Sequence, residues 1–181
     1  MWEIFTQSRK SRQKLESRWH RLYRLAYSWC HDPDLAGDLT QDTLAKALKN
    51  MHQLKDTDAL DAWLFSILNN CWKDYWRNRR EMSDLDQIEH EPFDDIHTHQ
   101  QRNDLISGVR QAIARLPLHQ RQVLSLVDIE EMSYKEVAQI LDIPIGTVMS
   151  RLCRARKELK DILITMERET VSNKPELRII K

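Results

Sequence analysis

Residues 133–159 read SYKEVAQILDIPIGTVMSRLCRARKEL, and this stretch decides the fold. It opens on a capping box: the Ser133 side chain accepts a backbone N–H, and the Glu136 side chain reaches back to the first residue. Asp142 tolerates the left-handed backbone of a tight turn, and Pro144 suits a first helical turn. The stretch therefore predicts a short helix, a turn and a second helix, which together form a helix-turn-helix.

The second helix of this motif has one apolar face and one polar, basic face. Its apolar residues recur every three or four positions: Val148, Leu152, Ala155, Leu159 and Ile162. The opposite face carries the side chains that we expect to meet DNA: Thr147, Ser150, Arg151, Arg154 and Lys157. Arginine in a major groove pairs with guanine or holds phosphate, so we predict DNA binding here. A solvated charged helix in a bundle is the alternative interpretation.

The composition favours an all-helical protein of two small domains. The chain has 181 residues, of which 41% are hydrophobic and only three are glycine, too few for the many turns of a sandwich or barrel. No apolar run approaches the length of a membrane span, and the basic N-terminus lacks the apolar core of a signal peptide. Three widely spaced cysteines without CxxC spacing exclude a disulfide framework. We therefore expect a cytoplasmic protein.

Charge is arranged in blocks, although 28 Lys and Arg balance 28 Asp and Glu overall. Residues 1–31 hold seven basic and two acidic side chains, whereas residues 32–62 hold three and seven. Residues 63–83 are again basic, with four against two. Local fields of opposite sign permit separate nucleic-acid and protein partners on one neutral chain.

The apolar periods divide the chain into five segments. An acidic, proline-containing stretch without a helical period separates two helical parts and is predicted to be a flexible linker. The expected segments are a basic extension, 1–14; a first helical domain, 15–83; the linker, 84–103; a second domain with the helix-turn-helix, 104–168; and a tail, 169–181.

A helix predicted over residues 35–51 has a face of mixed charge. We expect Leu44, Leu48 and Met51 to face the core. The residues expected outside and able to meet a partner are Asp38, Gln41, Asp42 and Lys46. Read alone, this face is either ordinary solvated surface or a docking face for a basic helix.

A third helix, ending near Arg80, interleaves aromatic and basic residues. Single-stranded DNA is bound in this way, with bases stacked on rings and phosphates near cations. The candidate residues on the face away from the core are Asn69, Asn70, Lys73, Trp76, Arg77 and Arg80. The alternative is that Trp63, Trp72 and Tyr75 belong to the core and that the arginines only complement the end of the helix dipole.

The sequence contains no recognisable catalytic or metal-binding motif. His97 and His99 lie in the linker and His31 follows Cys30, but no further ligand stands at a recognisable spacing. No catalytic triad, P-loop or glycine fingerprint occurs, so we expect no cofactor. Two other classes stay open: a free-standing repressor or activator, and a metal-dependent stress enzyme.

Four stretches of the sequence resemble the extracytoplasmic-function (ECF) sigma factors of the sigma-70 family. Residues 133–159 resemble region 4 of these proteins, and LPLHQRQVLSL at 116–126 is similar to the start of that domain. DLTQDTLAKALKN at 38–50 resembles the core-binding helix of region 2, and DAWLFSILNNCWKDYWRNRR at 61–80 the helix that reads and melts the minus-ten element. The resemblance covers about residues 15–82 and 103–163.

The resemblance implies a dissociable specificity subunit of RNA polymerase, active in a stress response and without a catalytic site. Asp38, Gln41, Asp42 and Lys46 then meet the clamp helices of the polymerase β′ subunit, and the second domain meets the β flap. Asn70 stands where the family contacts the non-template strand. Thr147, Ser150, Arg151 and Arg154 fall on the minus-thirty-five helix. An anti-sigma factor, sometimes membrane-held, usually inhibits such proteins.

One residue and one segment depart from the family pattern. Met149 stands where many relatives carry Lys or Arg, which removes one expected polar contact with DNA. The segment before Leu15 is longer and more basic than usual, and no role is assigned to it.

Overall fold

The computed structural model of the chain describes residues 12–54, 56, 58–82 and 104–172. Within these ranges all regular elements are helical, which confirms the all-α class. The helices are α2 (Trp19–Cys30), α3 (Pro33–Asn50), η1 (Met51–Gln53), α4 (Leu60–Met82), α5 (Asp104–Ala114), α6 (Leu118–Leu124), η2 (Ser125–Ile129), α7 (Tyr134–Leu141) and α8 (Ile145–Ser172). The expected linker, most of the basic extension and residues 173–181 lie outside the described residues.

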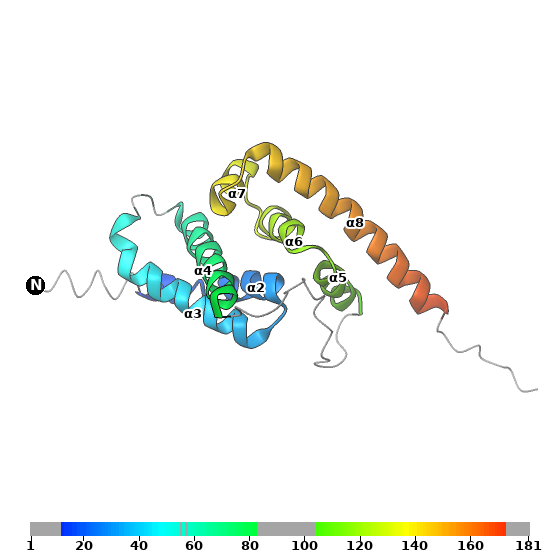
Figure 1. The fold of residues 1–181 in the computed structure, drawn as a ribbon, viewed down its shortest axis with the longest axis horizontal. Helices are drawn as coiled ribbons and strands as arrows, with labels where there is room; N and C mark the ends of the chain where they lie inside the picture. Colours follow the sequence, from blue (N-terminus) through cyan, green and yellow to red (C-terminus); the bar gives the residue numbers. More distant parts are fainter. Residues whose placement is uncertain (1–11, 55, 57, 83–103, 173–181) are drawn as a thin grey trace, which may run out of the picture.

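The first domain is built from α2, α3 and α4, with α3 packed against both others (Figure 1). The inner face of α2 buries Leu22, Ala26 and Trp29. The Asp32 carboxylate caps α3 by accepting the backbone N–H groups of residues 34 and 35. Because Pro33 is preorganised for the first helical turn, α3 begins two residues before the predicted start.

One core residue predicted on α3 is wrong. Leu48 is 45% exposed, whereas Leu44 and Met51 pack partly against the core. Small residues fill the inner face instead, because α3 lies between two helices, and both Thr40 and Thr43 are fully buried there. Each threonine hydroxyl donates a 2.7 Å hydrogen bond to the carbonyl four residues earlier, so its burial leaves no polar group unpaired.

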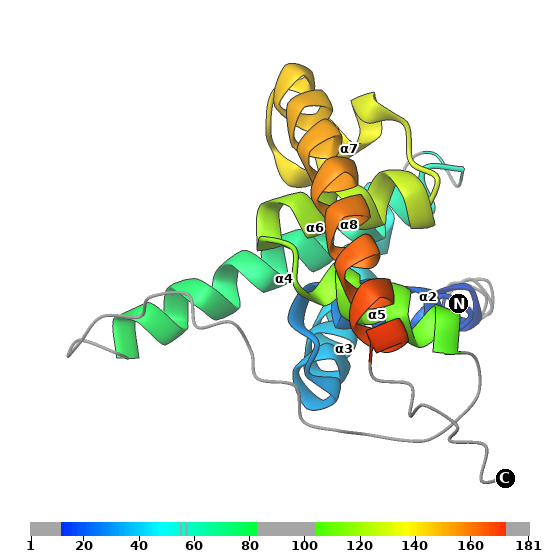
Figure 2. The same cartoon turned by 90° about the vertical axis from the view of Figure 1, so that its right-hand side faces the viewer.

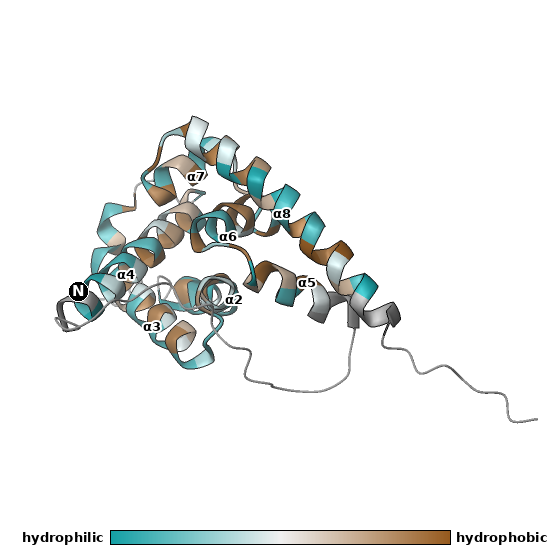
Figure 3. Cartoon of the chain, turned by 45° about the vertical axis from the view of Figure 1, so that its right-hand side comes forward, coloured by the Kyte–Doolittle hydropathy of each residue, from teal (hydrophilic) through white to brown (hydrophobic). Residues whose placement is uncertain are grey.

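The second domain comprises α5 to α8, and α8 packs against the other three helices. Figure 2 shows α8 running along this domain, and Figure 3 shows hydrophobic and hydrophilic residues alternating along it. It continues to Ser172, past the expected domain end at residue 168, so residues 169–172 belong to a helix and not to the expected tail. None of the helices in the described ranges is long and apolar enough to cross a bilayer.

The two domains pack directly against each other. Their buried side chains form one continuous hydrophobic cluster. Arg21 of α2 pairs with Asp61 and, across the domain boundary, with the Glu130 carboxylate, and it donates to the Glu130 carbonyl at 3.1 Å. Arg121 of α6 donates to the Trp29 carbonyl at 3.0 Å, and its burial lowers its pKa to about 10. We call this arrangement the closed arrangement.

Candidate nucleic-acid interface

The predicted capping box begins α7 and is confirmed. The Glu136 backbone N–H donates to Ser133 Oγ at 3.3 Å, and the Ser133 N–H donates to Glu136 Oε2 at 2.8 Å. Hydrogen bonding to its carboxylate from the Ser133 side chain, and then from the Ser133 backbone N–H, lowers the pKa of Glu136 below its ordinary value. A charged carboxylate at the helix start also complements the helix dipole.

The turn between α7 and α8 also follows the prediction. Asp142 adopts the left-handed conformation, with φ of 57°, and its N–H bonds to the Ala138 carbonyl. The Pro144 carbonyl accepts the N–H of Thr147 at 2.9 Å and so starts α8. A short capped helix and a three-residue turn over residues 142–144 therefore fix the direction of α8.

One face of α8 is buried and the other is open. Val148, Leu152 and Ala155 are at most 2% exposed. Of the predicted DNA-binding residues, Ser150, Arg154 and Lys157 are exposed, and Thr147 and Arg151 are half-buried. Within the described residues, the basic side chains of this set have no ion-pair partner: Arg151, Arg154 and Lys157. The open face therefore presents positive charge that the protein itself does not neutralise.

Arg156 belongs to the same helix but has a different environment. Its guanidinium makes two bonds to the Asp128 carboxylate, at 2.6 and 3.1 Å, and this contact raises its pKa. Arg156 is therefore held by an ion pair within the protein, and it provides a matched control for the unpaired basic residues of α8.

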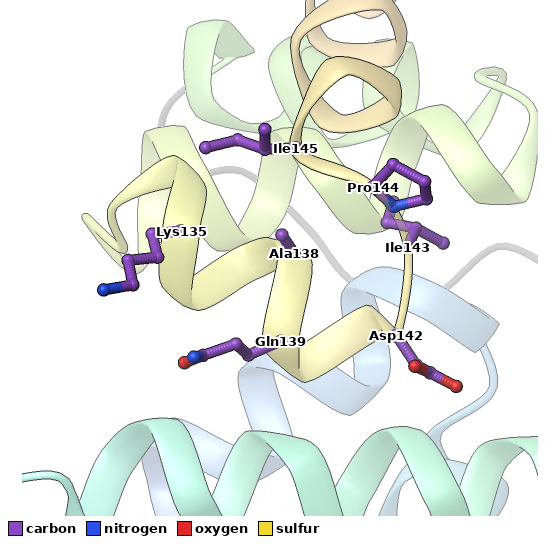
Figure 4. Close-up of a pocket in the computed structure, with 7 residues that line it drawn as sticks. All are labelled: Lys135, Ala138, Gln139, Asp142, Ile143, Pro144 and Ile145. Atoms are coloured by element: carbon purple, nitrogen blue, oxygen red, sulfur yellow. The ribbon is translucent and has the colours of Figure 1, made fainter.

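Sequence reasoning missed the part of α7 that borders this face. Lys135 and Gln139 line a shallow hollow with Ile145 at the start of α8 (Figure 4). Both α7 residues are exposed and lie one helical turn apart. Their spacing on the side opposite Val137 and Ile140 is the signal that could have identified them.

The minus-ten candidates on α4 are not all exposed, because Asn69 is covered in the closed arrangement. Asn69 is 2% exposed, and its Nδ2 donates to the Ile140 carbonyl at 2.9 Å. Lys73 Nζ lies 3.5 Å from the Leu141 carbonyl. Asn69 does face away from the core of the first domain, as predicted, but the end of α7 from the second domain covers it. Asn70, one residue further, is exposed.

The remaining α4 candidates have mixed environments. Arg77 is exposed and pairs with Asp74 at 2.9 Å, and the Arg80 side chain is not among those described. Trp76 was expected on the open side but packs partly against the core, since its ring meets the edge of Trp72 at a centroid distance of 5.7 Å. The alternative reading of the other aromatics is confirmed: Trp72 is buried, and Trp63 and Tyr75 pack against the core.

The predicted partner face of α3 is open. Asp38, Gln41, Asp42 and Lys46 are all exposed. Lys46 pairs with Asp74 of α4 at 3.2 Å, whereas no hydrogen bond or ion pair to the other three side chains occurs within the described residues. The free carboxylates make this face acidic.

Comparison with known proteins identifies both domains. The profile of sigma-70 region 2 matches residues 16–82, and that of sigma-70 region 4 matches residues 107–159. The chain is 35% identical over 148 residues to the ECF RNA polymerase sigma factor EcfG of Rhodopseudomonas palustris, over 78% of each chain.

The chain belongs to the ECF sigma factors of the sigma-70 family. This sigma factor is also 30% identical over 162 residues to the RNA polymerase sigma-H factor of Pseudomonas aeruginosa, covering 83% of this chain and 84% of that one. It is similar in structure to the sigma factor RpoE crystallised with the anti-sigma factor NepR from Bartonella quintana. That likeness has a TM-score of 0.71 and 34% identity, and it covers 83% of this sigma factor and 94% of that chain. Neither domain alone makes up 83% of the chain, so the likeness extends across both.

Metal chemistry finds no support in the described part of this sigma factor. No group of three or more His, Cys, Asp or Glu side chains is placed to hold an ion there. His97 and His99 lie outside the described residues.

Proposed function

We propose that this sigma factor binds core RNA polymerase and directs promoter-specific initiation by recognising minus-thirty-five and minus-ten elements. The observation that carries this proposal is the capped helix-turn-helix, which holds the unpaired Arg154 and Lys157 on the open face of α8. An α-helix fits the major groove, where such side chains reach base edges and phosphates. Family membership supplies the link to transcription.

The acidic face of α3 is our candidate for the polymerase contact. Asp38, Gln41 and Asp42 offer two carboxylates and an amide that no other described residue engages. A basic helix pair of the polymerase clamp is a complementary partner, and the second domain has the β flap as its expected partner. Sigma factors are specificity subunits and not catalysts, so bond formation belongs to the core enzyme.

We place minus-ten recognition on Asn70, Lys73, Arg77 and Arg80 of α4. Asn70 is exposed and offers both a hydrogen-bond donor and an acceptor to an unstacked base. Asn69 belongs to this site only when α7 moves away, because the Ile140 carbonyl covers it in the closed arrangement. Separation of the two domains would therefore add Asn69 to the minus-ten site.

An anti-sigma factor is the regulator that we propose for the closed arrangement. The support is the likeness to a sigma factor crystallised with such a protein, a likeness that extends across both domains. We expect the inhibitor to stabilise the contact that α4 and α7 make in the closed arrangement. The cytoplasm, where core polymerase and promoters reside, is the expected location.

Run-off transcription with purified core polymerase on genomic fragments tests the proposal. The sigma factor should co-purify with core and start RNA at defined positions. If it binds an operator tightly without polymerase and starts no transcript, it is a free-standing regulator and the proposal is wrong.

Arg154→Ala tests the upstream anchor. If Arg154 reads a base edge, holoenzyme affinity for the upstream element should fall by about 1–3 kcal/mol, measured by competition with duplex DNA at fixed salt. Arg156→Ala removes the same charge from the same helix, but from a side chain held by Asp128. Equal losses in both variants would show a general charge effect and would remove Arg154 from the recognition set.

Asn70→Ala tests the minus-ten site. Permanganate reactivity of unpaired thymines should decrease, because the variant lacks the amide that holds a flipped base, while upstream binding stays intact. Asn78→Ala removes an equally exposed amide from α4 and should melt the promoter normally. Normal melting by Asn70→Ala would refute the assigned role.

A further inference from the structure

An exposed apolar strip runs along α8 beside its basic residues. It consists of Ile145, Met149 and Cys153, which are spaced four residues apart and so lie on one side of the helix. Ile145 is 49% exposed, Met149 is 54% exposed and Cys153 is also exposed. At 1.5 Å per residue, the strip is about 12 Å long.

A second, polar strip runs parallel to the apolar one. It consists of Ser150, Arg154 and Lys157, which are also exposed. The buried face of α8, with Val148 and Leu152, lies on the other side of the helix, so neither strip is used to hold the domain together. The recognition helix therefore presents two kinds of chemistry side by side.

The charge around the apolar strip indicates what covers it. Arg154 and Lys157 adjoin it on α8, and Lys135 lines the hollow that Ile145 borders. Duplex DNA brings phosphates for these cations together with a groove floor of base edges. The one apolar group on that floor is the C5-methyl of thymine, and side-chain methyl and methylene groups pack against it.

We propose that Met149 contacts the C5-methyl group of a thymine in the upstream promoter element and so contributes specificity. Met149 is 54% exposed and lies at the centre of the strip, directly before Ser150. Its unbranched, polarisable thioether adapts to a methyl group better than a β-branched side chain. This inference rests on the proposed function, in which α8 occupies the major groove.

The test compares thymine with uracil, which differs only by that methyl group. Holoenzyme first selects an upstream element from a random-sequence duplex pool. The selected duplex is then synthesised with deoxyuridine in place of each upstream thymidine in turn. Synthetic DNA carries no 5-methylcytosine, so thymine is the only source of a C5-methyl group.

For the wild-type holoenzyme, loss of one methyl group should weaken upstream binding about three- to fivefold at a single position, the size expected for one buried methylene. Met149→Ala should bind the thymine duplex more weakly by a similar factor and should be indifferent to uracil there. Ile164→Ala removes another exposed apolar side chain of α8, away from the recognition face, and should keep the wild-type discrimination.

The outcomes separate this inference from the proposed function. If holoenzyme selects no upstream element, the proposed function of α8 fails. If it selects one but no deoxyuridine substitution matters, or Met149→Ala still discriminates, the methyl contact is wrong. If Met149→Ala weakens core polymerase binding and leaves discrimination intact, the strip is a protein-docking surface and the inference is overturned.

Discussion

At the scale of single residues, the three cysteines lie in three different environments. Cys30 is half-buried at the end of α2, and its Sγ donates to the Asp32 carbonyl at 3.2 Å. Burial raises its pKa from the ordinary value of 9.0 to about 11. Cys71 is buried in α4, and Cys153 is exposed on the apolar strip of α8. One thiol of the three therefore meets solvent directly.

Alkylation with iodoacetamide at pH 8 should modify Cys153 first, because only that thiol is exposed. Cys30 should stay protonated in the folded protein until the pH approaches 11, whereas the unfolded chain ionises near 9. Folding stability should therefore decrease between pH 9 and 11 as the unfolded state loses its proton. Peptide mass spectrometry measures the order of modification, and equal rates at Cys30 and Cys153 would contradict the assigned burial.

Residue environments could be predicted from the sequence only where one helix determines them. The exposure of Ser150, Arg154 and Asp38 follows from helical periodicity alone. The burial of Asn69 does not, because its cover is the Ile140 carbonyl, 71 residues away in the chain. Periodicity places Asn69 on the outside of its own domain and carries no information on what packs there.

At the scale of elements, capping residues decide where the helices start. Ser133 with Glu136 begins α7, and Asp32 with Pro33 begins α3. Elements without such signals could not be predicted from the sequence. The π-helical segment η2 adds a residue to the turn, and apolar spacing does not reveal it. The extension of α8 to Ser172 also lacks a stop signal, since neither Gly nor Pro occurs between residues 160 and 172.

Ser133→Ala should destabilise the second domain by about 0.5–2 kcal/mol, because the start of α7 loses its cap. Urea denaturation of the full chain measures the difference. Folding lowers the pKa of Glu136, so the ionised carboxylate stabilises the folded protein at pH values above the ordinary carboxyl pKa. This stabilisation is lost as the pH falls through the lowered pKa of the folded state. The gap between variant and wild type should therefore narrow in acid.

A matched serine provides the control for this prediction. Ser150 is exposed in α8, and its hydroxyl donates to the Thr147 carbonyl at 3.1 Å without capping a helix. Ser150→Ala should change the unfolding free energy by less than about 0.5 kcal/mol. A loss as large as that of Ser133→Ala would mean that the cap is not the cause.

At the scale of the whole molecule, the closed arrangement depends on a polar network around Arg21. Its guanidinium pairs with Asp61 in its own domain and with Glu130 in the other, and the Glu130 side chain is only 5% exposed. Arg121 adds a second link through the Trp29 carbonyl. Breaking the bond between Arg21 and Glu130 therefore weakens the contact between the domains.

Glu130→Gln should shift the protein toward separated domains. It removes a charge-assisted hydrogen bond that contributes about 1.5–3 kcal/mol. Small-angle X-ray scattering should show a larger radius of gyration, and core polymerase should bind faster. Asp128→Asn breaks an ion pair inside the second domain and should leave both unchanged. If the two variants scatter alike, Glu130 does not hold the domains together.

The covering of Asn69 by α7 also has a consequence for competition. A partner that needs this surface binds only the fraction of molecules in which it is uncovered. If closed molecules outnumber open ones by about 100 to 1, the apparent affinity of that partner falls about 100-fold. Small changes in the α4–α7 contact, such as one altered hydrogen bond, then set how well this subunit competes with others for a shared pool of polymerase. A change in this contact therefore alters the share of transcription that this sigma factor directs, without a change in any residue that touches the promoter.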